Sequence, residues 1–511
     1  MRWPDRTLLI AGALGAVTVA GFAPLYFYPL PIFTLAALMW LWSRAPTTTR
    51  RAFAIGWWFG LGFFLTGVSW VYVSLNTFGA MPAPLAAFFT LLFCAFLALF
   101  PALTGYVYAA LRVPLWMRLI IVTPAVWTLG EWVRGWIFTG FPWLALGYSQ
   151  VPASPLAGHA PVVGIFGVSL ITMMSAGAVL LLIASVRARR ETQSEKPWLR
   201  TISSMALLIT LWVSGYALKD VRWTEPTGEP TTVTLLQGNI AQDIKWTAEG
   251  LRTTLLRYRD MVLASRAKLI VFPETAIPLF LRDIPQDYLD ELADHARDNG
   301  GNVLLGVPER AGESDYYNSV ISLGASTKQV YRKSHLVPFG EFIPLRPLLG
   351  WIVSVLAIPL QDFSRGSQMQ QPLALGSQRV AVNICYEDAF GEEIIRQLPA
   401  ATLLANVSNV AWFGRSVAPS QHLQISQARA LETGRYMIRA TNTGMTGVID
   451  ERGRVLHLAA QFETAAVTAS VQGYTGATPY VRIGNAPVIA LCVCLLLGSM
   501  LYAGTRRLSK I

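Results

Sequence analysis

The sequence predicts a membrane α-helical bundle of about eight transmembrane helices joined to an α/β domain that faces water. Hydrophobic residues make up 53% of the chain and charged residues only 14%, whereas soluble domains carry about 25% charged residues. One long polar stretch, in which strand-like and helix-like segments alternate, interrupts the apolar runs. We therefore expect a seven-helix membrane region over 1–218, a water-facing α/β domain over 219–482, and a last helix with a short tail over 483–511.

The membrane helices are predicted from the lengths of the apolar runs, because about 20 residues are needed to cross about 30 Å of hydrocarbon. The first two runs are short or interrupted by proline, and the first could also be a signal peptide. It has no clear small-residue cleavage site and more spans follow it, so we interpret it as a helix. The predicted spans cover about 7–24, 27–43, 52–75, 83–111, 118–138, 162–186, 201–218 and 484–504.

The positive residues between these runs predict the orientation in the membrane. Fifteen Lys and Arg residues fall in the termini and loops of one side, and the opposite short loops contain none. Both termini are then cytoplasmic and residues 219–482 lie outside, in the periplasm of a bacterial cell with the chain in its inner membrane. The formal net charge is +11, but Asp220–Tyr480 holds 23 basic and 26 acidic residues and is slightly acidic. The positive excess therefore lies in the loops and termini outside this stretch. This distribution argues against nucleic acid as a partner.

Strand and helix signals alternate along the polar stretch. Strands are predicted at Val233–Gln237, Leu269–Phe272, Asn302–Val307, Ser319–Leu323, Val380–Ile384 and Thr402–Val407, and later at about 436–441, 445–450 and 455–459. Helices are predicted at about 249–266, 285–299, 389–397 and 420–434.

Three apolar strands of this domain end on side chains that carry chemistry, namely Glu274, Lys333 and Cys385. Strand ends of α/β folds converge on one crevice, so these residues can meet there. A thiolate is the attacking form of cysteine, a carboxylate can take its proton, and an ammonium can stabilise the developing negative charge. Each residue alone has a simpler interpretation, as a solvated surface charge or a small buried hydrophobe. Their joint occurrence in matching contexts favours catalysis.

The positions of the cysteines and histidines indicate whether the chain can form disulfides or bind a metal. Cys94, Cys492 and Cys494 lie in apolar runs and are interpreted as packing residues. Cys385 has no cysteine partner in the polar stretch, which excludes a disulfide within that domain. The five histidines are scattered without metal-ligand spacing, so we expect no metal and no cofactor.

Short motifs surround the three reactive residues. They are Phe272-Pro273-Glu274, the block from Lys333 to Glu341 and Cys385-Tyr386-Glu387. They resemble the signature blocks of the nitrilase (carbon-nitrogen hydrolase) superfamily and, within it, the apolipoprotein N-acyltransferase family. The resemblance extends along nearly the whole chain. It includes Gln237–Ile240 with Trp246, Asn406–Asn409 with Ala411–Gly414, and Gly140–Trp143.

The resemblance implies an αββα sandwich and a role for each residue that matches a motif. Glu274 is implied as general base, Lys333 as stabiliser of the tetrahedral intermediate and Cys385 as nucleophile. The implied supporting residues are Glu341, which orients Lys333, and Tyr386 and Glu387, which flank the nucleophile. Those implied in substrate binding are Trp246 in a mobile entrance loop, Asn409 and Trp412. Val410 departs from the family pattern, which often has a polar residue there.

The family reaction implies two lipid partners. A phospholipid is the acyl donor, and the acceptor is the free α-amino group of the diacylglyceryl-cysteine at the N-terminus of an apolipoprotein. The reaction is the last step of lipoprotein maturation, it proceeds by a ping-pong mechanism through a thioester on Cys385, and we expect a monomer. The alternatives are a membrane-anchored amidase that hydrolyses its substrate, a lipoprotein-binding module without activity, and a transporter. Apart from Glu131 and Arg134, the apolar runs hold almost no ionisable residues for transport.

Three further features have two interpretations each. Glu131 and Arg134, three residues apart, form either an ion pair that docks the domain or a lipid-headgroup contact. The apolar segment 348–360 is either a core helix or an arm that dips into the membrane surface or covers the site. His335 and His422 could act as bases, but the Glu–Lys–Cys set leaves no vacancy, so we interpret them as structural.

Overall fold

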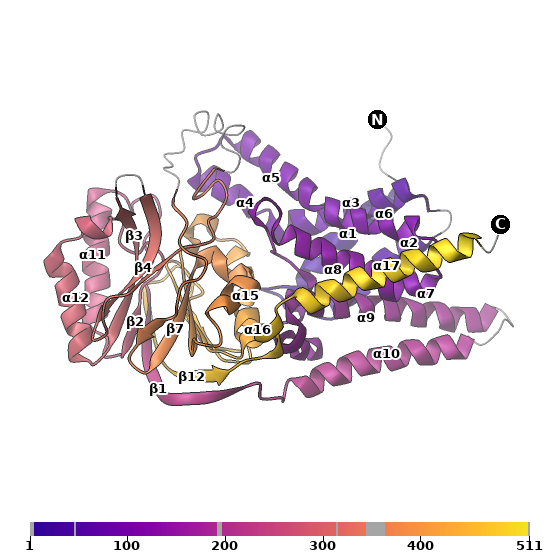
Figure 1. Cartoon of the computed structure of the whole chain (residues 1–511). Coiled ribbons are helices and arrows are strands. Elements are labelled where there is room, and N and C mark those ends of the chain that lie inside the picture. The colour runs from indigo at the N-terminus through magenta and orange to yellow at the C-terminus, as the bar shows by residue number, and fades with distance from the viewer. Residues whose placement is uncertain (1–4, 45–46, 192–196, 313–314, 344–362, 509–511) are drawn as a thin grey trace. The chain divides into compact units, whose positions relative to one another are not determined.

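The computed structural model describes residues 5–44, 47–191, 197–312, 315–343 and 363–508. Its chain forms two compact units, coloured along the sequence in Figure 1. The first comprises Met1–Tyr72, Ala83–Val221 and Ile483–Ile511, and the second Val73–Pro82 and Arg222–Arg482. All the sheet strands lie in the second unit, and the long apolar helices lie in the first.

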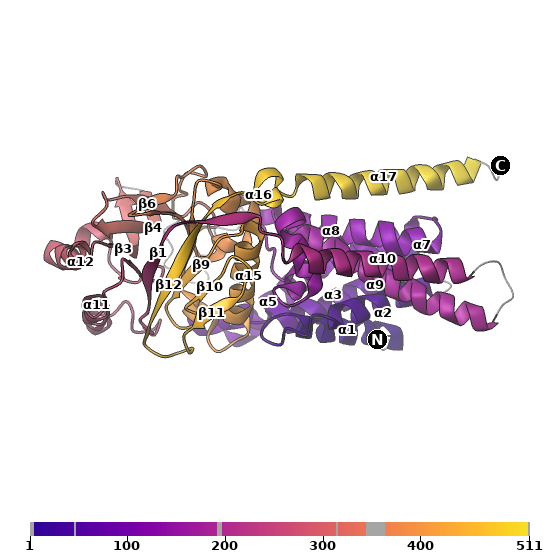
Figure 2. The same cartoon turned by 90° about the horizontal axis from the view of Figure 1, so that it is seen from below.

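The first unit is a bundle of helices that run side by side (Figure 2). Among the described residues, five helices are long and apolar enough to cross a membrane: Thr49–Val68, Ala83–Ala110, Pro155–Val186, Trp198–Leu218 and Ala486–Thr505. Two shorter apolar helices cover Arg6–Gly21 and Leu30–Ser43. A helical membrane region is thereby confirmed, and eight spans stays a prediction. The elements are α1 (Arg6–Thr18), α2 (Leu30–Ser43), α3 (Thr49–Val68), α5 (Ala83–Leu97), α6 (Leu99–Ala110), α8 (Thr123–Arg134), α9 (Ala160–Glu191), α10 (Pro197–Leu218) and α17 (Ala486–Leu508).

The span predicted over 118–138 has a less regular structure than an uninterrupted helix. A π-helical turn occupies Arg118–Val122 before α8 begins. Within the first unit, Glu131 accepts a hydrogen bond of 2.8 Å from the Leu146 backbone N–H. Arg134 donates to the carbonyl oxygen of Phe141 at 2.7 Å. Both buried side chains therefore hold the loop that follows α8, and these bonds reduce the cost of placing charges in an apolar bundle.

The second unit contains two six-stranded sheets. The first has the strand order β12-β1-β2-β3-β4-β5, and the second β11-β10-β9-β8-β7-β6. The first sheet consists of β1 (Thr224–Gln237), β2 (Leu269–Val271), β3 (Asn302–Ala311), β4 (Asp315–Gly324), β5 (Val330–Arg332) and β12 (Ala465–Gly476). The second consists of β6 (Leu373–Leu375), β7 (Gln378–Ile384), β8 (Leu403–Ser408), β9 (Met437–Thr441), β10 (Gly447–Ile449) and β11 (Val455–Leu458).

Alternation of side chains along each strand builds four layers. Leu304 in β3 points into the core between the sheets, whereas its neighbours Val303 and Leu305 pack outward. The outer face of the first sheet is covered by α11 (Ala248–Leu263) and α12 (Gln286–Asp298), and that of the second by α15 (Ala418–Thr433), as Figure 1 shows. This arrangement confirms the αββα sandwich.

The sheets extend beyond the predicted strands. Strand β12 and residues 224–232 of β1, which pair antiparallel with each other, were not predicted. This part of β1 is mostly exposed and rich in Thr, Glu and Pro, so it lacks the apolar alternation that marks a half-buried strand. Its pairing with a segment more than 200 residues away supplies the hydrogen bonds.

Gly306 in β3 lies directly under the segment that carries Glu274. A Cβ atom there would come within 2.1 Å of the Pro273 carbonyl oxygen and 3.0 Å of the Glu274 Cα. We expect Gly306→Ala to lower the free energy of unfolding by about 1–3 kcal/mol through overpacking and to reduce activity by displacing Glu274. Unfolding in detergent and acyl-transfer assays measure both effects. Gly498→Ala in α17, where a Cβ meets no atom within 4 Å, is the matched control; equal behaviour of the two variants would contradict the prediction.

Candidate active site

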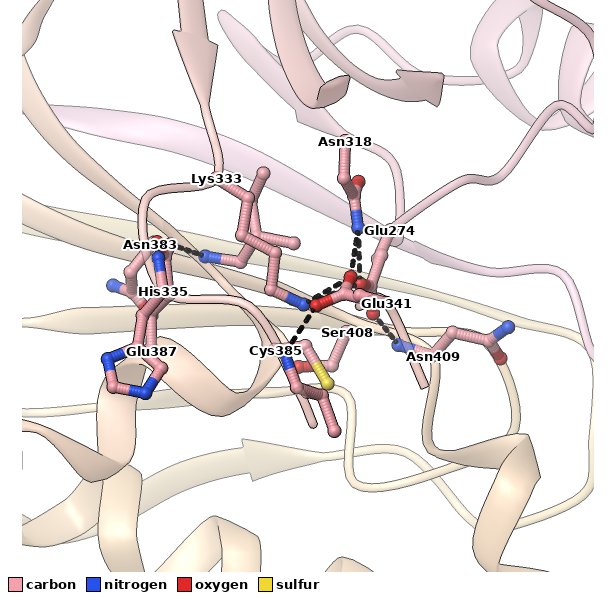
Figure 3. Close-up of polar contacts among 12 residues, drawn as sticks. Glu274, Asn318, Lys333, His335, Glu341, Asn383, Cys385, Glu387, Ser408 and Asn409 are labelled. Carbon is pink, nitrogen blue, oxygen red and sulfur yellow. Dashed lines mark hydrogen bonds and ion pairs between the residues drawn. The ribbon is translucent and has the colours of Figure 1, made fainter. Parts of the chain in front are cut away.

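The reactive residues come together where strands end. Glu274 follows β2, Lys333 follows β5 directly and Cys385 follows β7 directly. Glu341 joins them from the loop after β5. Figure 3 shows these four side chains in one cluster. The structure thus brings together the three residues predicted to be catalytic and the carboxylate predicted to support them.

A buried ammonium between two carboxylates is the centre of this cluster. Lys333 Nζ lies 3.2 Å from Glu274 Oε1 and 2.8 Å from Glu341 Oε1, and its side chain is 1% exposed. Asn318 Nδ2 donates to the same two oxygens at 2.7 and 3.1 Å. The Asn409 backbone N–H donates to Glu274 Oε2 at 2.9 Å. With these contacts the carboxylate of Glu274 is held in one orientation.

These contacts also set the protonation states of the resting site. Burial by itself would raise the pKa of Glu274, but Lys333, Asn318 and Asn409 together bring it below its usual value. Burial opposes the charged form of Lys333, and Glu274 and Glu341 overcome this effect and raise its pKa. The site therefore holds an ionised carboxylate beside an ammonium at neutral pH.

Cys385 has an uncommon backbone conformation, with φ of +54°. Its carbonyl oxygen accepts hydrogen bonds from Asn406 Nδ2 at 3.0 Å and His422 Nε2 at 3.2 Å, which stabilise the turn. Burial, together with the negative charge of Glu274, raises the pKa of the thiol, against the opposite effect of Lys333. The half-buried thiol is therefore protonated at rest and needs a base to react.

A buried polar network supports this turn from the outer face of the second sheet, where α15 covers it. Asp388 accepts hydrogen bonds from His422 Nε2 at 2.7 Å and from Arg439 Nη1 at 3.2 Å. Arg439 Nη1 also donates to Asn406 Oδ1 at 2.8 Å. Asp388, Arg439 and Asn406 were not predicted to be parts of the site. His422 was interpreted as structural, and it contacts the backbone of Cys385 and the side chain of Asp388.

The residues beside the nucleophile lie in different directions. Glu387 points away from the ammonium cluster and accepts backbone N–H groups of Ile384, Ser334 and His335 at 2.7, 2.7 and 3.1 Å. It therefore ties the segment that carries Lys333 to the strand that carries Cys385. Tyr386 contacts the ring of Phe390, with the centroids 5.1 Å apart.

The residues implied in substrate binding are divided between buried and exposed positions. Asn409 is 5% exposed, and its side chain bonds Gln242 and Asn442 at 3.1 and 3.2 Å. Trp246 and Trp412 are 60% and 40% exposed, so their rings are accessible to a ligand.

Two other expectations concern segments near the site. His335 stacks on Phe390, with centroids 3.8 Å apart, and its Nδ1 lies 3.0 Å from Glu393 Oε1, contacts that fit a structural residue. The apolar segment 348–360, interpreted as a core helix or an arm, lies outside the described residues.

Residues 14–178 match the family model of the apolipoprotein N-acyltransferase N-terminal domain, and residues 232–480 match that of carbon-nitrogen hydrolases. The apolipoprotein N-acyltransferase of Nitrosomonas europaea is 54% identical over 98% of both chains. That of Chromobacterium violaceum is 46% identical over 98% of this chain and 95% of its own. A solved nitrilase-superfamily amidase from Nesterenkonia AN1 is 17% identical, with a TM-score of 0.38, over 52% of this chain and 97% of its own.

The paired sheets, the family match and the Glu–Lys–Cys cluster at the strand ends define a carbon-nitrogen hydrolase type of domain, attached to an apolar helical unit. With 54% identity over 98% of both chains, this chain belongs to the apolipoprotein N-acyltransferase family, and it is an acyltransferase. The resemblance inferred from its motifs is thereby confirmed.

The contacts of Glu387 generate a stability prediction. Glu387→Gln places an NH₂ group opposite backbone N–H donors, and we expect it to lower the free energy of unfolding by about 1–3 kcal/mol because buried donors lose their acceptor. Activity should fall as Lys333 and Cys385 lose their common support. Unfolding in detergent measures the first effect. The exposed Glu463 provides the matched control Glu463→Gln, and a Glu387 variant as stable as this control would refute the assignment.

Proposed function

We propose that this acyltransferase moves a fatty acyl chain from a membrane phospholipid to the α-amino group of the diacylglyceryl-cysteine at the N-terminus of an apolipoprotein, the last step of lipoprotein maturation. The observation that carries the proposal is the cluster of the Cys385 thiol, the Glu274 carboxylate and the buried Lys333 ammonium (Figure 3), and the direction of their pKa shifts agrees with it. Membership of the family supports the identity of the acceptor. The apolar helices support a donor that resides in the bilayer.

The first half-reaction acylates the enzyme. Glu274 takes the proton of the Cys385 thiol as sulfur attacks the ester carbonyl carbon of the phospholipid. The carbonyl oxygen becomes an oxyanion, which the Lys333 ammonium stabilises. When the tetrahedral intermediate collapses, the bond to the glycerol oxygen breaks and Glu274 returns the proton to that oxygen. Lysophospholipid leaves, and a thioester remains on Cys385.

The second half-reaction transfers the chain by a ping-pong sequence. The neutral α-amino group of the acceptor attacks the thioester carbonyl carbon, and Glu274 removes a proton from the attacking nitrogen. Collapse of the second tetrahedral intermediate forms the amide and breaks the C–S bond, and Glu274 gives its proton to the leaving sulfur, which restores the thiol and the ionised carboxylate. Glu341 orients Lys333 through both steps, as its contact of 2.8 Å supports.

The placement in the cell is part of the same proposal. Residues 219–482 face the periplasm, both termini are cytoplasmic, and the chain acts as a monomer in the inner membrane. The one-sided distribution of Lys and Arg among the short loops supports this topology. The catalytic domain then lies on the side where exported lipoproteins carry their lipid.

Detection of the acyl-enzyme tests the proposal directly. Intact-mass measurement after incubation with phospholipid should show one acyl adduct on the wild type, removable by hydroxylamine, and none on Cys385→Ala. Glu274→Gln and Lys333→Met should lower the acylation rate by at least about 10²-fold, because general base and oxyanion stabilisation contribute at that scale. With acceptor peptide present, acylated peptide should exceed free fatty acid. Free fatty acid as the main product would instead support the amidase-like alternative.

The lowered pKa of Glu274 predicts the pH at which the acylation rate falls on the acidic side of its pH profile, the acid limb. Glu274 acts as a base only when ionised, so the limb should lie below the usual carboxylate pKa of about 4.3. Asn318→Ala removes a hydrogen bond that favours the ionised form, so the pKa of Glu274 should rise and the limb should move to higher pH. Burst-phase acylation measured across pH gives both curves. A limb that stays in place or moves to lower pH would contradict this account.

A further inference from the structure

Lys245 is a buried cation that the mechanism above does not use. It lies in the segment between β1 and α11, and its side chain belongs to a residue only 2% exposed. Throughout the described parts of the chain, no group accepts a hydrogen bond from its Nζ and no carboxylate forms an ion pair with it. The side chain is buried, but the Nζ atom at its end keeps some contact with solvent, so a ligand of opposite charge can reach the ammonium and pair with it.

The surroundings of Lys245 place it at the active site. Gln242, three residues earlier, accepts a hydrogen bond of 3.1 Å from the Asn409 side chain. The backbone N–H of Asn409 in turn holds Glu274. The Nζ of Lys245 lies 6.0 Å from the ring centre of Trp246, which is exposed to solvent. The segment that carries Lys245 therefore contacts the residue that holds the general base, and an accessible aromatic ring lies beside its ammonium.

The charge of Glu274 acts on Lys245 but leaves it distinct from the cation at the nucleophile. Burial lowers the pKa of Lys245 to about 8, and Glu274 is the charge that opposes this effect. The charges that act most strongly on the Cys385 thiol are Glu274, Lys333, Glu341 and Asp388, and Lys245 is not among them. The contacts agree with this separation: Lys333 contacts Glu274 Oε1, whereas Asn409, which bonds Gln242 in the segment of Lys245, contacts Glu274 Oε2. Lys333 is thus the cation for the reacting carbonyl, and Lys245 belongs to the segment on the other side of the general base.

The proposed first half-reaction determines what occupies the space beyond Glu274. Glu274 returns its proton to the leaving glycerol oxygen, so the glycerol of the donor must lie against its carboxylate. A phosphodiester on the same glycerol is only a few bonds from that oxygen. It carries a negative charge and acceptor oxygens, which are the partner that an unpaired ammonium lacks. The acceptor substrate fits less well, because its reacting end is an amine and a second ammonium would repel its charged form.

From this placement we infer that Lys245 binds the phosphodiester of the acyl donor and thereby selects phospholipid over neutral acylglycerol. The inference rests on the proposed function, because it names a contact within the first half-reaction. It assigns Lys245 to donor recognition and leaves the chemistry at the carbonyl to Lys333.

The test is the ratio of two acylation rates on the full-length enzyme in detergent micelles. One donor is a phospholipid, and the other is diacylglycerol with the same acyl chains, which has no phosphate. For Lys245→Met we expect the phospholipid to diacylglycerol ratio to fall by roughly 10- to 100-fold, the scale of one hydrogen bond to a charged group. Lys245→Arg should retain part of the preference. The ratio does not depend on the fraction of folded enzyme, and exposed Lys268 provides Lys268→Met as the matched control.

The other outcomes of this experiment distinguish failure of this inference from failure of the proposed function. If both rates fell by one factor in Lys245→Met, the residue would support Glu274 or the fold, and phosphate recognition would be refuted. Unchanged rates with both donors would refute it as well. If the wild type formed no acyl adduct from phospholipid, the proposed function would fail and this inference with it. An acylated wild type with an unchanged variant ratio would overturn the inference alone.

Discussion

The structure of the catalytic unit depends on one buried ammonium held between two carboxylates. Lys333 is 1% exposed, and a charge at that depth is stable only with close partners of opposite sign. Glu274 and Glu341 provide them, but they come from a different strand end and from a loop, so β2, β5 and the loop after β5 must all be in place together. The charge cluster and the first sheet therefore require each other, and a site of this kind cannot form locally.

The nucleophile depends on the opposite layer of the sandwich. Cys385 follows β7 with a positive φ, a conformation that persists only where the surroundings over-determine it. Its carbonyl is held by Asn406 and His422, and these are held by Asp388 and Arg439. Alternation along the strands directs Asn406 and Arg439 toward α15, while their neighbours enter the core between the sheets. The second sheet therefore has polar residues at strand positions that would otherwise be apolar.

The sequence predicted the catalytic set because strand ends, reactive residue types and motifs all coincide at Glu274, Lys333 and Cys385. It also predicted most strands, since a short and nearly continuous apolar run is typical of a strand that is buried on both faces. It missed β12 because small residues such as Ala469 and Gly473 occupy inward positions of this strand and give its alternation little apolar contrast, and it missed the first part of β1 because that part is mostly exposed. It missed Asn318, and it could not assign the contacts of Glu387, because a polar side chain in a strand or beside a nucleophile has no sequence signal for the direction in which it points. Burial and partners are properties of the assembled layers.

The protonation pattern explains why the resting enzyme can keep an unprotected thiol outside the cytoplasm, where we propose that it lies. The pKa of the Cys385 thiol is raised and that of Glu274 is lowered, so the proton stays on sulfur at rest. A preformed thiolate would be open to oxidation, whereas a thiol reacts far more slowly. Proton transfer becomes favourable only when a carbonyl is present, because the negative charge then moves from sulfur to an oxygen that Lys333 can stabilise. The same carboxylate–ammonium pair that makes Glu274 a weak base at rest therefore couples activation of the nucleophile to the arrival of an acyl donor.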